Sequence, residues 1–522
     1  MSVAQTKSGG NEFKLHRGHG LVTDVFKPED MEALGGIHAV GHTRYSTAGG
    51  KNQIEGFQPF CVKYRMGNIA LAHNGNLSNA PELRSFFENQ GVLTQSTVDS
   101  ELFLHLISHS KRQSQVDQIF DAMTQAEGAF CVIIITEKFM CAVRDPNGFR
   151  PLCIGRLKGR GLNGTDGYCV ASETCALDLC KAEYVRDVEP GLSFLQSFVT
   201  PLSDYRSSRQ VHTLPSLCFR MLLSLPGLHL PLRNHRRVSG IQPCDQALTG
   251  PCACPGEMII IDKRTVETGT FASLKLPQKF GTSQCIFEYV YFARPDSRVF
   301  GEYVTKVRRE LGRQLAREWP IPKVKEGEAV PVIIPIPESA THATLGFHEE
   351  SLKMGRPCVF DFGFFRNPYV GRSFISPSQE LRDLKVLCKF NPMEHTLKGR
   401  DVVVVDDSIV RGTTARQLVK LLYAAGARTV HVRISSPPVT DGCYYGMDFP
   451  SREELFANKH NGDVEAMCKW LQVDSLGYLS PEGLVESATR ASQTKHSFCR
   501  ACFTGVYPVP IEPAKDENRH DW

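Results

Sequence analysis

The sequence predicts a mixed fold in two parts: an α+β front half, followed by an α/β half with a parallel sheet. Two observations carry this prediction. Before about residue 190, strand-like runs such as 131–145 alternate with turn signals, and after about residue 285 apolar runs alternate with helical stretches. The second pattern is typical of βα units, whose parallel strands share one sheet. We expect three segments, covering residues 1–283, 284–480 and 481–522.

Composition narrows the class of protein. The chain has 522 residues, of which 41% are hydrophobic and 22% charged, and its net charge is +4. This balance disfavours a dedicated nucleic-acid-binding protein, and no apolar run is long enough to span a membrane. The first twenty residues lack the apolar core of a signal peptide. The 18 cysteines are scattered, which favours reduced thiols in a cytoplasmic protein. From the charge balance and the apolar runs, we expect neither nucleic-acid nor membrane partners.

The stretch VVVVDDSIVRGTT, residues 402–414, contains the strongest motif. Its valines predict a strand buried on both faces, with Asp406 and Asp407 at the carboxyl end, where α/β folds bind ligands. A helical pattern follows and ends at Gly426. The turn between strand and helix consists of Ser408, Ile409, Val410, Arg411, Gly412, Thr413 and Thr414. Free N–H groups at such a helix start bind phosphate.

The two carboxylates need a different partner, because they would repel a phosphate. A ribose diol or Mg²⁺ suits them, so a phosphorylated ribose satisfies both halves of the motif. An ordinary βα turn with a solvated acidic pair is the alternative. The complete string resembles the type I phosphoribosyltransferase signature. That resemblance implies that residues 408–414 hold the 5′-phosphate of phosphoribosyl pyrophosphate (PRPP), and that Asp406 and Asp407 hold its ribose.

Two further segments extend this site. Residues 329–350 repeat the order of strand, polar turn and helix start, and the turn at 337–340 predicts a second anion loop containing Glu338 and Ser339. We expect this loop to hold pyrophosphate, and Ser339 with the aspartate pair to bind Mg²⁺; a helix capped by Ser339 is the alternative. Residues 366–383 are long and polar, as in a mobile lid from which Arg372 covers the pyrophosphate, or a plain surface loop.

Three short motifs mark the front half: GHTRYST (41–47), LAHNGNL (71–77) and TVDSELF (97–103). Arg44 suits capture of a carboxylate, and Asp99 could hold an ammonium group. Asn74 and Gly75, which we expect to follow a strand, offer the donors of an oxyanion hole. Together they describe a site for an α-amino acid whose side-chain carbonyl is attacked. Taken singly, the Asn-Gly pair could be a hairpin turn and the arginine could face water.

This constellation resembles the type II glutaminase domain, an N-terminal-nucleophile αββα sandwich. Residues 143–156 and 170–178 fit the same family, and Arg44, Asn74, Gly75 and Asp99 fall on its substrate and oxyanion positions. A glutaminase followed by a phosphoribosyltransferase is the order found in the amidophosphoribosyltransferase family. The resemblance implies formation of 5-phosphoribosylamine from PRPP and glutamine, the opening step of purine synthesis. It also implies a homotetramer and purine nucleotides as feedback inhibitors.

Four cysteines form a third motif: Cys285, Cys443, Cys499 and Cys502. Their spacing leaves open zinc, a [4Fe–4S] cluster or a buried CxxC without metal. The cluster-containing branch of the amidophosphoribosyltransferases has cysteines in these four contexts. That resemblance implies a structural [4Fe–4S] cluster that pins the C-terminal tail to both domains.

The chain departs from the family pattern in two places. Residues 192–256, rich in proline and without Lys or Glu, interrupt what would otherwise be a hairpin connection, and we expect them not to fold. Translated non-coding sequence or a lineage-specific regulatory insert would explain them. The family's glutaminase uses an N-terminal cysteine, whereas the first cysteine here is Cys61 in a strand-like run. We therefore expect a truncated chain that uses ammonia and not glutamine.

The alternatives are other classes of protein. A glutamine-dependent sugar isomerase or an asparagine synthetase shares only the front-half motifs, and residues 402–414 disfavour both. A non-catalytic regulator that binds PRPP or nucleotides is the other alternative. It would bind PRPP without releasing pyrophosphate.

Overall fold

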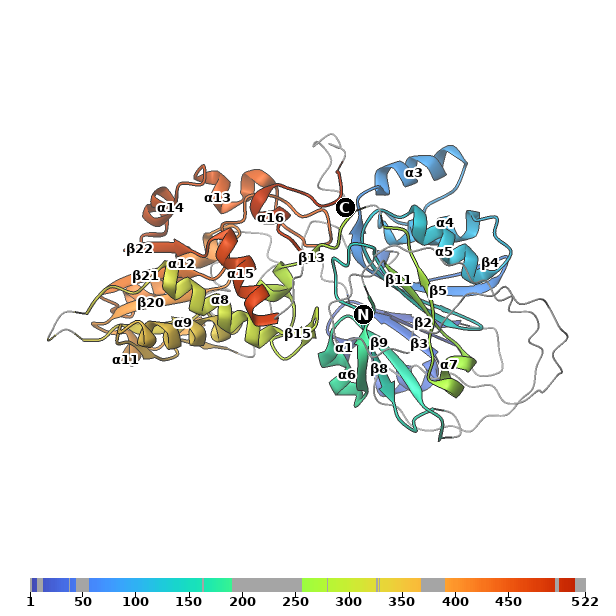
Figure 1. The fold of residues 1–522 in the computed structure, drawn as a ribbon, viewed down its shortest axis with the longest axis horizontal. Helices are drawn as coiled ribbons and strands as arrows, with labels where there is room; N and C mark the ends of the chain where they lie inside the picture. Colours follow the sequence, from blue (N-terminus) through green and yellow to red (C-terminus); the bar gives the residue numbers. More distant parts are fainter. Residues whose placement is uncertain are drawn as a thin grey trace.

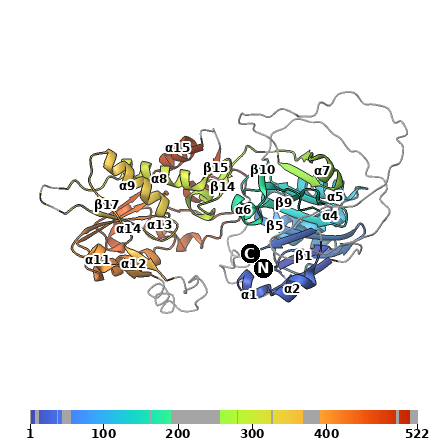
Figure 2. The same ribbon diagram turned by 90° about the horizontal axis from the view of Figure 1, so that it is seen from below.

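The computed structural model consists of two lobes that lie side by side (Figure 1). It describes residues 2–6, 13–36, 38–43, 56–161, 164–189, 256–278, 280–324, 327, 329–367, 390–492 and 497–511. The front half, blue to green, forms one lobe, and the back half, yellow to red, forms the other (Figures 1 and 2). Arg44, Arg372, the lid predicted from Pro368 onward and the segment 192–255 lie outside the described residues.

The front lobe is built on a six-stranded antiparallel sheet with the order β12-β11-β7-β6-β5-β4. Its strands are β4 (Phe60–Tyr64), β5 (Gly67–Leu77), β6 (Gly128–Thr136), β7 (Met140–Arg144), β11 (Glu257–Ile261) and β12 (Ala272–Lys275). Alternate residues of β5 enter different cores. Ile69 and Leu71 join one apolar cluster, whereas Ala70 and Ala72 join another, as the two-residue period of a strand requires.

Helices cover one face of this sheet and strands cover the other. The first core includes residues of α3 (Ala80–Asn89), α4 (Ser100–His109) and α5 (Gln115–Gln125). The second core includes residues of β3 (His38–His42), β8 (Cys153–Leu157) and β9 (Gly167–Ala171). Two three-stranded sheets, β2-β1-β3 and β10-β8-β9, supply these strands, with α6 (Thr174–Cys180) packed on β8 and β9. This layering confirms the predicted αββα sandwich.

The remaining front-lobe elements are short. They are β1 (Ser2–Thr6), β2 (Phe13–Arg17), α1 (Val22–Val25), α2 (Pro28–Leu34), β10 (Glu183–Asp187) and α7 (Lys263–Thr268). The predicted hairpin at the interruption is wrong, because β10 and β11 belong to different sheets. The two ends of the interruption nevertheless lie close together, since the N–H of Glu189 donates to Glu257 Oε2 at 3.1 Å.

The back lobe contains the predicted parallel sheet, with the order β17-β16-β20-β21-β22. Its strands are β16 (Val332–Pro335), β17 (Val359–Phe360), β20 (Asp401–Asp406), β21 (Thr429–Ile434) and β22 (Ser475–Tyr478). Val402 and Val404 pack into one core and Val403 and Val405 into another. The four-valine run is therefore buried on both faces of the sheet, as predicted.

Helices cover both faces of the parallel sheet. One face packs on α8 (Val304–Glu318), α9 (Thr341–Lys353) and α15 (Pro481–Ser492), and the other on α12 (Thr413–Ala424) and α14 (Val464–Leu471). The other short elements are β13 (Gln284–Cys285), η3 (Glu288–Phe292), β14 (Arg298–Val299), β15 (Glu302–Tyr303), β18 (Phe364–Arg366), β19 (Phe390–Pro392), α11 (Glu394–Leu397), η4 (Arg452–Glu454), α13 (Phe456–Lys459), β23 (Phe498–Cys499) and α16 (Ala501–Thr504). Among the described residues, no helix is long and apolar enough to cross a membrane.

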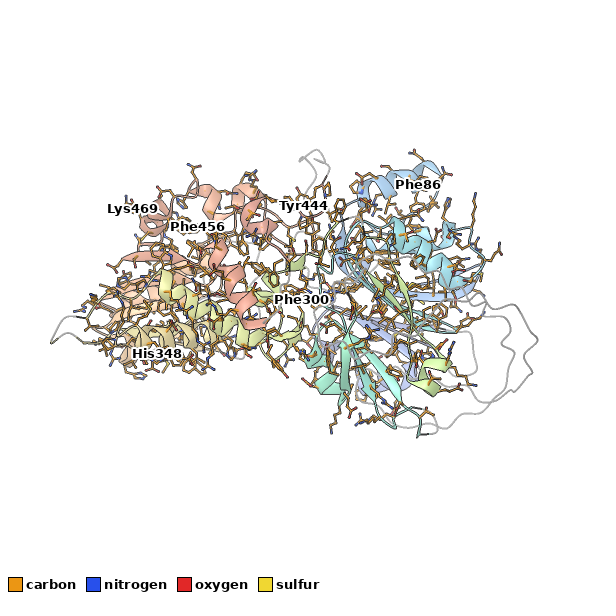
Figure 3. The ribbon with its side chains drawn as sticks, viewed as in Figure 1. Phe86, Phe300, His348, Tyr444, Phe456 and Lys469 are labelled. Atoms are coloured by element: carbon orange, nitrogen blue, oxygen red, sulfur yellow. The ribbon has the colours of Figure 1, made fainter. Side chains whose placement is uncertain are left out.

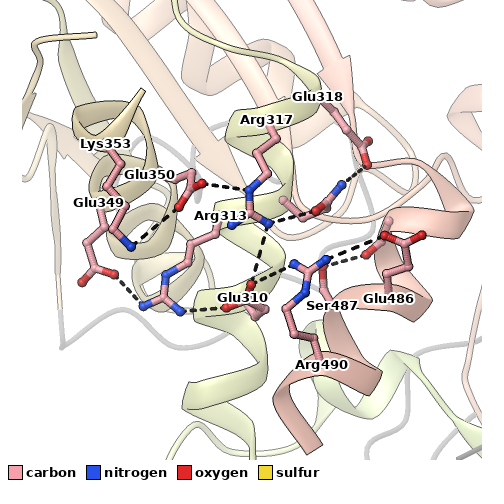
Figure 4. A network of polar contacts seen from close by, with 12 residues as sticks. Glu310, Arg313, Arg317, Glu318, Glu349, Glu350, Lys353, Glu486, Ser487 and Arg490 are labelled. Atoms are coloured by element: carbon pink, nitrogen blue, oxygen red, sulfur yellow. Dashed lines mark hydrogen bonds and ion pairs between the residues drawn. The ribbon is translucent and has the colours of Figure 1, made fainter. Parts of the chain in front are cut away.

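A network of ion pairs joins α8, α9 and α15 on the outside of the back lobe (Figure 4). Arg317 Nε lies 2.8 Å from Glu350 Oε1, and Glu310 accepts from both Arg313 Nη1, at 2.7 Å, and Arg490 Nη1, at 3.0 Å. These partly exposed pairs tie the three helices together, although exposed pairs contribute little each. The network lies on the helices and not at the carboxyl edge of the sheet, where ligands bind in α/β folds.

Candidate functional site

The acidic pair and the second predicted loop meet at the carboxyl edge of the parallel sheet. Strands β16 and β20 are neighbours, with Pro335 opposite Val405, so their following turns lie side by side. The Ser339 hydroxyl donates to the Asp407 carboxylate, and Ser408 Oγ donates to Asp407 Oδ1 at 2.7 Å. Ser339 therefore faces the acidic pair. It does not cap α9, whose N-cap residue is Ala340 without a side-chain cap bond.

Burial and mutual repulsion disfavour two negative charges at this position. Burial, followed by the charge of Asp407, raises the pKa of Asp406 well above its usual range. Burial also raises the pKa of Asp407, although bonds from Ser339 and Ser408 and the charge of Arg308 oppose it. A cation or the hydroxyls of a sugar placed against these carboxylates would relieve the repulsion. Arg308, from α8, is a neighbour of the pair that the sequence analysis missed.

The turn after the acidic pair has the geometry of an anion-binding helix start. Gly412 has φ +77°, a region that L side chains rarely adopt, and a Cβ built on it would lie 2.6 Å from the Phe456 ring. Helix α12 begins at the next residue, and Thr413 and Thr414 are exposed on its first turn. The carbonyl of Val410 accepts from the Phe456 N–H at 2.8 Å, which fixes the turn against the segment around η4. Ile409 is buried in the core.

Two charged residues predicted to bind substrate have protein partners in this structure. Arg411 Nη2 lies 2.6 Å from Glu454 Oε2, so its guanidinium points along the surface toward η4. Glu338, whose side chain is 77% exposed, pairs with Arg366 Nη1 at 3.1 Å. The backbone of both residues still belongs to the two anion loops, but their side chains are held by these ion pairs.

The glutamine-site motif lies inside a strand. We expected Asn74 and Gly75 to follow a strand, but both belong to β5, where they stand opposite Cys131 and Phe130 of β6. A glycine is required there: Gly75 has φ +150°, and a Cβ built on it would lie 2.0 Å from the carbonyl oxygen of Ala129. The pairing that places these residues involves β6, far from the motif in sequence, which explains why the motif was expected after the strand and not within it.

Asp99 lies directly beside this strand end. Its Oδ2 accepts from the Leu77 N–H at 2.8 Å, and its side chain is buried. Burial alone would raise its pKa, but the charge of His73, its bond to the carboxylate and bonds from Leu77 and Ser100 outweigh burial and lower the pKa of Asp99. A negative Asp99 matches the predicted role as a partner for an ammonium group.

A buried polar network behind β5 was not predicted from the sequence. His73 Nδ1 lies 2.9 Å from Ser100 Oγ, Gln58 Nε2 donates to the same hydroxyl at 2.9 Å, and the His73 N–H donates to Gln58 Oε1. The network joins residues 58, 73 and 99–100, which no local spacing rule connects. The adjacency of His73 to Asn74, and of Ser100 to Asp99, was the available signal.

The four motif cysteines gather where the two lobes meet. Cys285 and Cys499 stand opposite each other in the parallel pair β13 and β23. Burial raises the pKa of the Cys502 thiol, and the other three cysteines lie near enough to raise it further. Among the described residues, no group of three or more His, Cys, Asp or Glu side chains has the arrangement that holds a single metal ion.

Comparisons with known proteins extend over nearly the whole chain. Residues 42–178 match a family model described as a glutamine amidotransferase domain. The chain is 39% identical to the chloroplastic amidophosphoribosyltransferase 1 of Arabidopsis thaliana, over 94% of this chain and 70% of the relative. It is 36% identical to amidophosphoribosyltransferase of Bacillus subtilis, over 96% of this chain and 87% of the relative.

Solved structures give the same result. The structure of an allosteric regulatory enzyme of purine biosynthesis matches with a TM-score of 0.75 and 35% identity, covering 98% of this chain and 90% of the other. The glutamine PRPP amidotransferase of Bacillus subtilis, complexed with ADP and GMP, matches with a TM-score of 0.74 and 34% identity, covering 98% and 92%. The two lobes and their sites thus define a glutamine amidotransferase joined to a phosphoribosyltransferase. The chain belongs to the amidophosphoribosyltransferase family.

Proposed function

We propose that this chain forms 5-phosphoribosylamine from PRPP and ammonia at the carboxyl edge of its parallel sheet. The observation that carries the proposal is the meeting of Asp406, Asp407 and Ser339 beside the helix start at Thr413. An acidic pair that repels itself, next to free helix N–H groups, is complementary to a phosphorylated ribose. Amidophosphoribosyltransferases open purine biosynthesis, and the chain's membership of this family supports the same reaction here.

Each part of the site has a task in this reaction. The turn 408–414 binds the 5′-phosphate through backbone N–H groups and hydroxyls, and the loop at 337–340 binds pyrophosphate. Asp406 and Asp407 bind the ribose and stabilise positive charge at its anomeric carbon as pyrophosphate leaves. The charge of Arg308 opposes the rise in the pKa of Asp407 that burial causes, so Arg308 favours the ionised form of that carboxylate without outweighing burial.

Magnesium suits the same residues. Carboxylate and hydroxyl oxygens are its preferred ligands, and Asp406, Asp407 and Ser339 supply them in contact with one another. The raised pKa values of the two carboxylates would fall back when a cation neutralised them. Bound there, Mg²⁺ would supply neutralisation of pyrophosphate charge.

Ammonia is the nitrogen source that we propose for this chain. Two thiols in the front lobe lie near the glutamine-site strand, and neither suits amide attack. Cys61 lies in β4, opposite Ala70 of β5, and burial raises the pKa of its thiol. Cys131 is opposite Asn74, and burial raises its pKa to about 12. A thiolate is the reactive form, so both are poor nucleophiles at neutral pH.

A [4Fe–4S] cluster is the cofactor that we propose for Cys285, Cys443, Cys499 and Cys502. Two observations support this set of ligands. Cys285 and Cys499 stand opposite each other, and Cys285, Cys443 and Cys499 all lie near enough to Cys502 to raise its pKa. Burial raises the pKa of Cys285 and Cys443, and the charge of the buried Arg150 partly opposes that rise, so its guanidinium is complementary to anionic sulfur ligands at this position. Bound there, the cluster would supply a cross-link between the tail and both lobes.

Partners and location are also proposals. A Bacillus subtilis relative binds ADP and GMP, and we propose purine nucleotides as inhibitors of this chain. A homotetramer and a cytoplasmic location complete the proposal, both expected from the family.

Pyrophosphate release tests the reaction. The purified chain is mixed with PRPP, Mg²⁺ and either ammonium chloride or glutamine. We expect pyrophosphate release with ammonium and none above the blank with glutamine. PRPP binding without release in either mixture would instead indicate a regulator. Release with glutamine that a thiol-alkylating glutamine analogue abolishes would refute the ammonia-only proposal.

Iron and sulfide analysis tests the cofactor. After anaerobic purification, we expect about four iron and four sulfide atoms per chain, the content of one [4Fe–4S] cluster. Cys499→Ser should lose the brown colour, while Cys468→Ser should keep it, since Cys468 donates to Val473 O in a different part of the lobe. Stoichiometric zinc without iron would contradict the assignment.

A further inference from the structure

A loop of the back lobe lies directly on the glutamine-site strand of the front lobe. We call residues 442–447 the Tyr444 loop. Gly446 has φ +96°, and a Cβ built on it would lie 3.0 Å from both the Cα and the carbonyl carbon of Gly75. One residue further along β5, Asn76 Nδ2 donates to the carbonyl oxygen of Tyr444 at 3.1 Å. Figure 3 shows Tyr444 at the junction between the lobes.

Gly75 is therefore enclosed from two sides. A Cβ built on Gly75 itself would lie 2.0 Å from the carbonyl oxygen of Ala129 in β6, and the backbone of Gly446 covers it from the other lobe. Both glycines have positive φ, so close packing and backbone conformation each exclude a side chain there. The backbone of Gly75 is therefore in close contact with both β6 and the Tyr444 loop.

The Tyr444 loop is itself firmly anchored. The Tyr445 ring stacks on Phe149, with centroids 4.1 Å apart, and its hydroxyl donates to Val509 O at 2.8 Å. Tyr507 donates to Gly442 O at 2.7 Å. Tyr445, Phe149 and Val509 belong to one apolar cluster that also contains Ala129 of β6. The loop and the strand pair that it covers thus share a core at the lobe junction.

We propose that Gly446 is a positioning residue for the glutamine site, supplied by the transferase half. The inference rests on the proposed role of Gly75 as an oxyanion donor. Such a donor is effective only when its N–H is held where charge develops, because a mobile dipole must first be reoriented. Gly446 and the Tyr444 carbonyl hold the Gly75–Asn76 segment in place. The glutamine site is therefore complete only when the back lobe is docked.

Matched glycine variants test this role. Gly462 also has a positive φ, of +73°, but a Cβ there would meet nothing within 4 Å. Gly446→Ala and Gly462→Ala thus share the backbone penalty and differ in contact with Gly75. We expect Gly446→Ala to push the Tyr444 loop away from β5 and so to break the bond from Asn76 to the Tyr444 carbonyl. Hydrogen exchange in the peptide 69–78 should then be faster and L-glutamine binding weaker, each about fivefold, the order expected for one lost hydrogen bond. Gly462→Ala should change neither.

A second variant keeps the test decisive if Gly446→Ala does not fold. Asn76→Ala removes only the bond to the Tyr444 carbonyl, and we expect faster exchange in the same peptide, with unchanged exchange in peptides from β20 and α12. Unaltered exchange and glutamine affinity in the folded variants would overturn the inference. Ammonium-dependent pyrophosphate release is measured in parallel. Its absence in the unmodified chain would count against the proposed function and leave the positioning result intact.

Discussion

The two candidate sites are assembled in opposite ways. In the back lobe, the acidic pair and the phosphate turn occupy one continuous stretch, residues 406–414, at the end of a single strand. In the front lobe, the glutamine strand depends on residues 58, 99–100 and 129 and on a loop of the other lobe. The acidic pair of the first site can therefore be changed without removing an apolar core residue, whereas the second site is built into a buried network that joins remote segments. This difference predicts how variants at each site divide between activity and stability.

The largest expected effect is on activity at the back-lobe pair. In the double variant Asp406→Ala, Asp407→Ala, we expect pyrophosphate release to fall more than about 10³-fold, because two groups that stabilise developing charge are lost. Stability should be unchanged or higher, since two mutually repelling carboxylates are removed, one half-buried and one buried.

Asp401→Ala is the control for this variant. Asp401 lies at the other end of β20, where its bond from Arg428 lowers its pKa, so its removal should reduce stability and leave activity intact. Circular dichroism and thermal unfolding check both variants. Unfolding of the double variant would contradict the placement of the pair at an open sheet edge.

The sequence predicted the back-lobe site, whose residues are close together in sequence, better than the front-lobe glutamine site, whose residues come from remote segments. Sheet order alone brings the turns after β16 and β20 together, so Ser339 was placed correctly from the strand pattern. Asn74 and Gly75 were expected after a strand and not within one, because their partner strand is remote in sequence. Likewise, nothing near residue 75 indicates Gly446, and no local spacing connects Gln58 with Ser100. The interruption at 192–256 resembled a broken hairpin, although its flanking strands belong to different sheets.

The second largest expected effect is a pH-dependent change in the stability of the front lobe. Glu101, beside the Asp99 motif, accepts from the N–H groups of Gln95 and Ser96 at 2.7 and 2.8 Å. Burial alone would raise its pKa, but bonds from His105, Gln95 and Ser96 lower it from 4.5 to about 2. The carboxylate thus stabilises the fold above the unfolded-state pKa by about 3 kcal/mol, and this contribution is lost as pH falls from about 5 to 2.

Glu101→Gln tests this sign. The variant should lower the free energy of unfolding at pH 7 and have much less effect at pH 3, where the unmodified chain has already lost most of the contribution. Urea unfolding followed by circular dichroism at both pH values measures it. Glu88→Gln, on the exposed face of α3, should have no effect at either pH. An equal loss of unfolding free energy for Glu101→Gln at pH 7 and pH 3 would mean that the charge of Glu101 does not contribute to stability.

A smaller loss of stability is expected for Ser100→Ala. The hydroxyl serves Gln58 and His73, both buried, and its removal leaves them without that partner, at a cost of about 2 kcal/mol. Hydrogen exchange in the peptide 69–78 should rise with it, since His73 belongs to β5. Ser108→Ala on the same helix is the control, because that exposed hydroxyl donates to the carbonyl oxygen of His105 in its own helix. Equal destabilisation by Ser100→Ala and Ser108→Ala would show that the buried network around Ser100 stabilises the fold no more than a surface hydrogen bond does.

The smallest expected effect returns to the back lobe and separates binding from folding there. Gly412→Ala places a Cβ against Phe456 at 2.6 Å and strains a backbone with φ +77°, so the phosphate turn must shift. Because the turn contacts only the 5′-phosphate in our proposal, KM for PRPP should rise about tenfold, equivalent to about 1.4 kcal/mol, with little change in kcat. Gly399→Ala is the matched control: its φ is +73° and a Cβ there would meet nothing within 4 Å. Both variants carry the backbone strain, Gly412→Ala should lose more thermal stability because of its contact with Phe456, and only Gly412→Ala should change KM. A kcat loss at Gly412 as large as that of the aspartate double variant would show that the turn and the acidic pair act as one unit, and the back-lobe site would then be as cooperative as the front one.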